Sequence, residues 1–214
     1  MVVITMMKNI KLIANYILTA AENDINTINF IDIDDTVFKT DTKIRVVDKE
    51  GNIKKRLSTE EFNKYVLKPG ESYDFSESSD SDIFYRTAKS IKSVLNKINE
   101  LLNNAKNNKI IFLTARADMN DKHKFLEVFR KYDIPVDNKD IVYIERAGNL
   151  MMKASIAKRV IVEEYIANGN YDKIRFIDDS ERNLREFLKL RQKYLNIEFE
   201  AIKVIKDGKM ITIN

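Results

Sequence analysis

Short apolar runs alternate with helical patterns along most of this chain, and no other feature constrains the fold as strongly. The first strand-like run begins at Ile28, and others lie at 109–113, 141–144, 173–177 and 198–205; helical patterns lie at 7–22, 86–104, 121–132, 156–168 and 181–194. Such alternation predicts an α/β fold with a mostly parallel sheet covered by helices on both faces. In this class of fold, ligands bind beyond the carboxyl ends of the strands.

Polar residues follow three of these strand-like runs. The run from Ile28 leads into Asp32, Asp34, Asp35 and Thr36; the second ends at Thr114, and the run at 173–177 is followed by Asp178 and Asp179. Each group alone is ordinary chemistry for starting a helix or leaving a strand. All three together at one sheet edge would gather like charges, which need a cation or a proton between them.

These residues carry a resemblance to a known family. The pattern Asp32-x-Asp34-x-Thr36 after an apolar strand resembles the first motif of the haloacid dehalogenase (HAD) superfamily. Three further blocks follow in that superfamily's order: 109–116, lysines at 153 and 158, and 174–183. The chain most resembles small phage-type HAD hydrolases and the phosphatase domains of polynucleotide kinases. The resemblance implies a Rossmann-like HAD fold and a phosphatase.

In that resemblance, Asp32 is the nucleophile and forms an aspartyl-phosphate. Asp34 protonates the leaving oxygen and later deprotonates the attacking water. The implied cofactor is Mg²⁺, which prefers oxygen ligands together with substrate phosphate. It would be held by Asp32, by the main-chain carbonyl of Asp34 and by Asp178, with Asp179 as the alternative. Asn183 is expected to brace this last loop.

Positive charge and hydrogen-bond donors complete the expected site. Thr114 is placed to donate to a phosphoryl oxygen, and a lysine would neutralise the charge that builds up there. Ser155 is expected to cap the helix that follows it, which favours Lys158 in the first turn over Lys153 in the preceding loop. Thr36, Arg116 and Arg146 are candidate substrate-binding residues.

The segment 38–85 interrupts the alternation and is expected to form a small cap or flap within a single domain of residues 1–214. A hairpin is predicted at 43–57 around Asp48-Lys49-Glu50-Gly51-Asn52, followed by a short helix at 59–66. The acidic, serine-rich run 71–82 is expected to be a solvated loop. A second hairpin is expected at the end of the chain, turning at Asp207-Gly208.

Composition limits the remaining function classes. The chain contains no cysteine, which excludes a disulfide framework, a thiol nucleophile and a cysteine zinc site. With no signal segment and no apolar run of about 18 residues, the expected location is the cytoplasm. A net charge of +4 favours an anionic partner only mildly.

The leading hypothesis is therefore a Mg²⁺-dependent phosphomonoesterase acting on a phosphorylated small molecule or a nucleic-acid phosphate end. A P-loop, which a nucleotide kinase would need, does not accompany it. A receiver-type phosphoacceptor is one alternative, although receivers place the acidic pair before a separate phosphorylated aspartate. A non-catalytic phosphate-binding protein on the same scaffold is another, against which the intact set of carboxylates argues. No membrane or obligate protein partner is expected.

Overall fold

A six-stranded, mostly parallel sheet forms the centre of the protein in the computed structural model, which describes residues 25–62, 64–104 and 108–213. Its strands are β1 (Thr27–Ile31), β7 (Asn108–Thr114), β8 (Val142–Arg146), β9 (Lys173–Asp178), β10 (Glu198–Val204) and β11 (Met210–Ile213), in the order β11-β10-β9-β1-β7-β8. The expected terminal hairpin is present, because β11 pairs antiparallel with β10 and Gly208 takes the positive φ of 80° between them. The expected helix at 7–22 lies outside the described residues.

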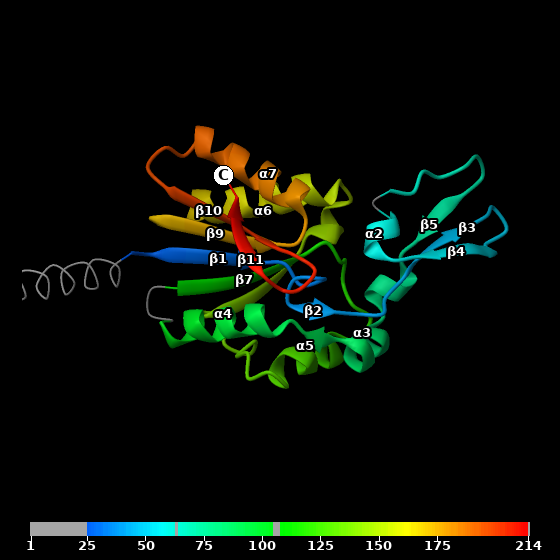
Figure 1. Cartoon of the computed structure of the whole chain (residues 1–214), viewed down its shortest axis with the longest axis horizontal. Coiled ribbons are helices and arrows are strands. Elements are labelled where there is room, and N and C mark those ends of the chain that lie inside the picture. Colours follow the sequence, from blue (N-terminus) through cyan, green and yellow to red (C-terminus); the bar gives the residue numbers. More distant parts are fainter. Residues whose placement is uncertain (1–24, 63, 105–107, 214) are drawn as a thin grey trace, which may run out of the picture.

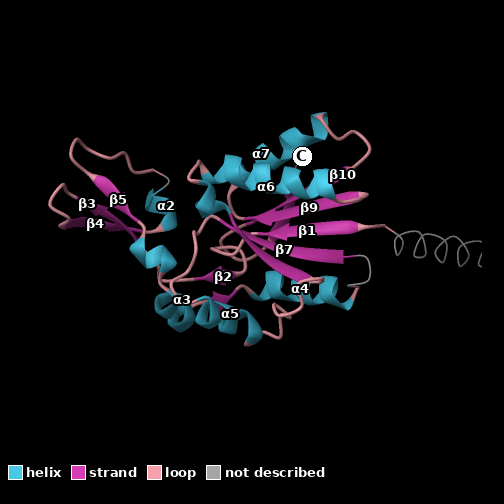
Figure 2. Cartoon of the chain, turned by 180° about the vertical axis from the view of Figure 1, so that it is seen from behind, coloured by secondary structure: helices cyan, strands magenta, loops and turns pink. Residues whose placement is uncertain are grey.

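Helices cover both faces of this sheet, as the alternation predicted (Figures 1 and 2). The helices α4 (Lys92–Asn103) and α5 (Lys122–Arg130) cover one face, and α6 (Ala154–Asn168) and α7 (Glu181–Leu188) cover the other. Side chains of β7 alternate between the two cores: Ile110 and Phe112 face one, whereas Ile111 and Leu113 face the other. Continuous apolar runs are typical of strands buried on both faces.

The helical pattern predicted at 86–104 is wrong as a single helix. The chain instead forms α3 (Ser81–Thr87), a short strand β6 (Lys89–Ser90) and then α4. The strand β6 pairs antiparallel with β2 (Phe38–Lys39), and the amide of Ile91 donates to the carbonyl of Val37. These long-range hydrogen bonds favour an extended backbone over local helix formation. The last helix is also shorter than predicted, because α7 gives way to a 3-10 turn, η4 (Lys189–Gln192).

The segment after β2 forms a small separate sheet with the order β4-β3-β5. Its elements are β3 (Ile44–Val47), β4 (Ile53–Leu57), α2 (Thr59–Phe62), β5 (Ser72–Asp74) and the 3-10 turn η1 (Ser76–Ser79). The hairpin is confirmed, and the helix is shorter than expected. The prediction of a solvated loop at 71–82 is wrong, because Tyr73 and Asp74 pair with Val46 and Arg45 and add a third strand.

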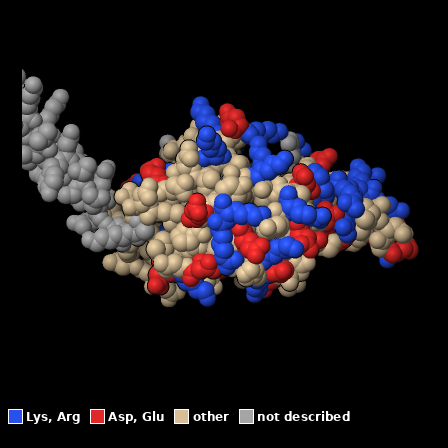
Figure 3. All heavy atoms as spheres, turned by 90° about the horizontal axis from the view of Figure 1, so that it is seen from below, with Lys and Arg blue, Asp and Glu red and all other residues tan. Residues whose placement is uncertain are grey.

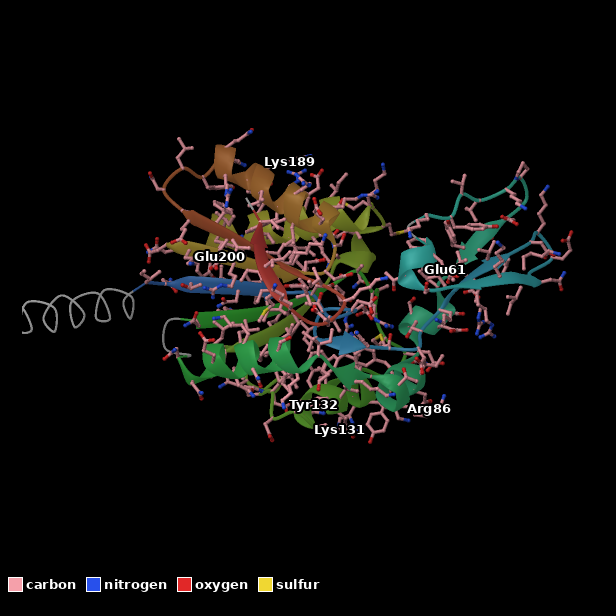
Figure 4. All side chains as sticks on the ribbon, viewed as in Figure 1. Glu61, Arg86, Lys131, Tyr132, Lys189 and Glu200 are labelled. Atoms are coloured by element: carbon pink, nitrogen blue, oxygen red, sulfur yellow. The ribbon has the colours of Figure 1, made fainter. Side chains whose placement is uncertain are left out.

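The insertion is smaller than the 38–85 expected from the sequence. Phe38 and Phe84 belong to the core of the main domain, where their rings pack edge to face with centroids 5.8 Å apart. Tyr132, labelled in Figure 4, stacks on Phe38 and its hydroxyl accepts from the amide of Ser90. The separate unit is therefore residues 40–80, which we call the insertion; it extends away from the main sheet in Figure 1. Among the described helices, none has the length and apolar character needed to span a bilayer.

Glu77 holds the insertion together and gives a first testable prediction. Its buried carboxylate accepts from Arg45 Nε at 2.8 Å, Arg56 Nη1 at 2.9 Å and the amide of Lys43 at 3.1 Å. Because Glu77→Ala leaves these donors without an acceptor, we expect it to destabilise the insertion by about 2–4 kcal/mol. Proteolysis within residues 40–80 should accelerate, whereas Glu50→Ala on the exposed turn should leave it unchanged. Equal cleavage of the two variants would contradict this role.

Candidate functional site

The parallel register brings the polar ends of three strands to one edge of the sheet. Ile31 of β1 lies beside Phe112 of β7 on one side and Ile177 of β9 on the other. Asp32, Thr114 and Asp178 follow within two residues of these positions, and all three are buried. The sequence therefore placed these residues correctly at the carboxyl ends of neighbouring strands, where an α/β sheet binds its ligands.

Three carboxylates gather at this edge around one ammonium group. Asp32, Asp178 and Asp179 each offer one oxygen within 4.8 Å of the others. The Nζ of Lys158 lies 2.5 Å from Asp32 Oδ1 and 2.8 Å from Asp178 Oδ2. Asn183 donates to both oxygens of Asp178, at 3.1 and 3.0 Å, and thus braces the loop as expected. The cluster combines oxygen donors for a hard cation with a positive charge for an anion.

Burial sets the electrostatics of this cluster. Burial, only partly offset by Lys158, holds the pKa of Asp32 well above its usual range. Burial, and to a smaller extent the charge of the neighbouring Asp178, raises the pKa of Asp179 to about 7. Burial alone would lower the pKa of Lys158, but Asp178 and Asp32 outweigh it, so the pKa is raised and the ammonium stays charged. Three ionised carboxylates facing one ammonium would carry an excess of negative charge, which either a proton or a bound cation relieves.

A tight turn leads from β1 into β2 and carries the rest of the first motif. The amides of Val37 and Phe38 both donate to the carbonyl of Ile33, and Asp35 takes a left-handed conformation with φ 57°. Aspartate tolerates this conformation better than most residues. Thr36 is fully buried, and its Oγ1 accepts from the amide of Asp179 at 3.0 Å. Thr36 therefore ties the β9 loop to the β1 loop through its hydroxyl oxygen, and a contact with substrate stays a prediction.

A second set of contacts surrounds Asp34. Arg116 Nε lies 2.9 Å from Asp34 Oδ2, and Arg116 Nη2 lies 2.6 Å from Oδ1. Thr114 Oγ1 lies 3.4 Å from Asp34 Oδ2 and accepts from the Arg116 amide at 3.1 Å. Arg116 was expected to bind substrate, but its buried guanidinium donates to protein groups through all three nitrogens. This geometry makes it a residue that orients Asp34.

Arg146 and Lys153 do not join the cluster. Arg146 Nε lies 3.2 Å from Asp118 Oδ1, and its guanidinium stacks over the Phe125 ring, so it braces a neighbouring loop. Lys153 is exposed at the cap position of α6. The helix begins at Ala154, so the prediction that Ser155 caps it is wrong; Ser155 lies buried in the first turn. Lys158 lies one turn into α6 and still reaches the strand ends, where its Nζ contacts Asp32 and Asp178.

Asp35 and Asn149 contribute to this edge through contacts that the sequence did not predict. Asp35 is partly buried, and its carboxylate hydrogen-bonds the Thr59 hydroxyl of the insertion. Burial and the adjacent Asp34 raise the pKa of Asp35. Asn149 Oδ1 accepts from the amide of Asp118 at 3.1 Å and supports the loop after Thr114. An aspartate directly after Asp34 was a visible signal, whereas nothing in the local pattern tied Asn149 to a loop 31 residues earlier.

Gly148 gives a prediction about this supporting loop. A Cβ at position 148 would lie 2.5 Å from the Ala117 nitrogen and 2.6 Å from the Ala115 oxygen. Because these are backbone atoms, Gly148→Ala must displace the segment that carries Arg116. We expect a loss of about 1–3 kcal/mol in the free energy of unfolding, measured by urea titration. Ala117→Ser, at an exposed position of the same loop, should have little effect; unaltered stability of Gly148→Ala would refute the close packing.

Comparisons of the chain with protein-family models, with curated proteins and with solved structures gave no match.

Proposed function

We propose that this protein is a Mg²⁺-dependent phosphomonoesterase of the HAD type that acts through an aspartyl-phosphate on Asp32. The observation that carries the proposal is the cluster of the buried Asp32, Asp178 and Lys158 with the half-buried Asp179, beside Thr114 at the end of the neighbouring strand. Phosphoryl transfer needs a nucleophile, a bound cation and positive charge around the transferred group. This cluster offers a carboxylate that could attack phosphorus, carboxylates that could hold a cation, and an ammonium group, at the edge of the sheet where α/β folds bind their ligands.

The donor set fits magnesium. Mg²⁺ prefers carboxylates and substrate phosphate over nitrogen or sulfur ligands, and the three gathered side chains are all carboxylates. Asp32 and Asp179 would hold the ion together with Asp178, whose two oxygens also bond Asn183. When bound, the ion would neutralise the phosphate and draw it toward Asp32. A contribution from the main-chain carbonyl of Asp34 stays a prediction.

The residues divide the reaction into two displacements. Asp32 attacks phosphorus, the bond to the leaving oxygen breaks, and Asp34 gives that oxygen a proton. Asp34 then takes a proton from water, whose oxygen attacks phosphorus and releases phosphate, restoring Asp32. Lys158 and the Thr114 hydroxyl stabilise charge on the transferred group. The fork of Arg116 fixes the direction in which the Asp34 carboxylate points.

The substrate is proposed only as a phosphate monoester, either a phosphorylated small molecule or a nucleic-acid end. On the face shown in Figure 3, basic and acidic side chains are interspersed. On this face, the mixed charges do not form a patch of one sign that would favour nucleic acid over a small phosphorylated molecule. The cluster accounts for the reaction at the phosphate, but it does not identify the leaving group to which that phosphate is attached.

Release of inorganic phosphate tests the proposal. The panel should contain sugar phosphates, nucleoside monophosphates and 3′- or 5′-phosphorylated oligonucleotides, each with Mg²⁺ and with EDTA. We expect turnover of at least one substrate class with Mg²⁺ and a loss of at least about 100-fold in EDTA. Turnover that survives metal removal would contradict the mechanism. Phosphate binding without turnover would favour the non-catalytic alternative.

A further inference from the structure

Arg116 connects parts of the protein that lie far apart in sequence. Besides its fork to Asp34, its Nη1 lies 2.6 Å from the carbonyl oxygen of Ser78. Its Nη2 also lies 3.2 Å from the hydroxyl of Thr42 and 3.4 Å from that of Thr40. Thr40 and Thr42 lie in the segment that enters the insertion, and Ser78 lies in the segment that returns from it. One side chain therefore bonds the first motif to both connections of the insertion.

The surroundings of Arg116 make these bonds strong. Its side chain is 5% exposed, and its guanidinium stacks over the Phe84 ring at 5.1 Å from the centroid. Leaving a buried charge without its partners is costly, so the fork and the insertion contacts are expected to hold together. Arginine suits this position because its planar guanidinium can bond several acceptors at once.

Other contacts keep the insertion attached when Arg116 is changed. The amide of Asp41 donates to Thr87 Oγ1 at 3.1 Å, and the amide of Asn120 donates to the carbonyl of Ser79 at 2.9 Å. These bonds join the insertion to α3 and to the loop before α5, and neither involves the candidate site. A variant of Arg116 can therefore loosen the insertion without detaching it.

We propose that Arg116 is a positioning residue that couples the insertion to the candidate site, so that the connections at 40–42 and 78–80 and the Asp34 carboxylate move as one unit. A shift of the insertion then redirects Asp34, and a change at Asp34 loosens the insertion. The consequence for turnover rests on the proposed function, whereas the coupling itself does not. The coupling is reciprocal, as any free energy shared between two sites must be.

Amide hydrogen exchange of the substrate-free protein measures the coupling directly. Peptides covering 38–44 and 75–82 should be followed in the wild type, Asp34→Asn, Arg116→Lys and the double variant. We expect each single variant to accelerate exchange of both peptides by about tenfold, as when a charged hydrogen bond is weakened. The double variant should add little, because both changes break the same fork.

Two matched controls isolate the effect. Asp32→Asn makes the same chemical change two residues away, at a side chain bonded to Lys158. Arg130→Lys removes a similar fork on α5, where Arg130 bonds Asp137 at 2.9 and 2.7 Å. Both should leave exchange of the two peptides unchanged. Unchanged exchange in Asp34→Asn, or additive effects in the double variant, would overturn the coupling.

A milder variant covers the case in which Arg116→Lys does not fold. Thr42→Val removes one acceptor of the Arg116 guanidinium and leaves both charges in place. If both connections move as one unit, it should accelerate exchange of both peptides, by less than Arg116→Lys does. Exchange like that of the wild type would count against the coupling. Turnover gives a separate readout: Arg116→Lys should lower kcat about tenfold or more with little change in KM, because it misdirects Asp34. Absence of turnover in the wild type would refute the proposed function and leave the exchange test intact.

Discussion

Asp32→Asn is expected to reduce phosphatase turnover by on the order of 10⁴-fold or more, because the amide cannot attack phosphorus. The fold should survive, since asparagine has nearly the same volume and Lys158 keeps Asp178 as its partner at 2.8 Å. Removing one of three clustered carboxylates also relieves like-charge repulsion. The melting temperature should therefore stay within about 5 °C of the wild type or rise.

Two measurements are needed for this prediction, turnover under saturating substrate and thermal unfolding. Asp137→Asn is the matched control, because Asp137 pairs with Arg130 on the surface, away from the cluster. It should leave turnover unchanged. Turnover of Asp32→Asn near the wild-type rate would remove Asp32 from the role of nucleophile. Loss of the folded state would instead show that Asp32 is needed for structure.

Lys158→Met is expected to affect stability more than any other single change at the cluster. Methionine fills a similar volume but leaves Asp32 and Asp178 buried without their cation, at 4% and 0% exposure. Breaking a buried ion pair by removing one partner costs about 3–5 kcal/mol. We therefore expect a loss of this size in the free energy of unfolding, measured by urea titration, together with loss of turnover.

Lys153→Met is the control, and it also separates the two lysines that the motif order left open. Lys153 is exposed before α6, so its loss should change the free energy of unfolding by less than about 0.5 kcal/mol. The double variant Lys158→Met/Asp32→Asn should recover part of the lost stability, since it removes one of the unpaired carboxylates. Equal effects of the two lysine variants would contradict the assignment.

The periodicity of the sequence predicted the architecture of the main domain well. Strands β1, β7, β8, β9 and β10 and the helices α5 and α6 lie within a few residues of their expected positions, whereas α4 begins later and α7 ends earlier than expected. Local patterns failed where partners far along the chain decide the conformation. The pairing of β6 with β2 breaks the helix expected at 86–104, and the pairing of β5 with β3 orders a segment that composition alone marks as a loop. The strands β5 and β6 are both short, and neither alternates clearly between apolar and polar residues.

The candidate site was predictable where residues follow parallel strands. Asp32, Thr114 and Asp178 meet because the register of three strands aligns their ends. The partners of long side chains were not predictable, since Arg116 and Arg146 look alike in sequence yet bond Asp34 and Asp118. The bond by which Thr36 ties the β1 and β9 loops together was not predicted either. Such outcomes depend on packing between segments that no local pattern describes.

A trapped phosphoenzyme tests the central claim most directly. In Asp34→Asn, attack by Asp32 can proceed slowly, but the water that would release phosphate is no longer activated. After incubation with Mg²⁺ and a turned-over phosphate monoester, acid quenching and peptide mass mapping should find one phosphoryl group on Asp32. Phosphate release from the wild type with no phosphorylated peptide in Asp34→Asn, or a phosphoryl group on another residue, would contradict the account.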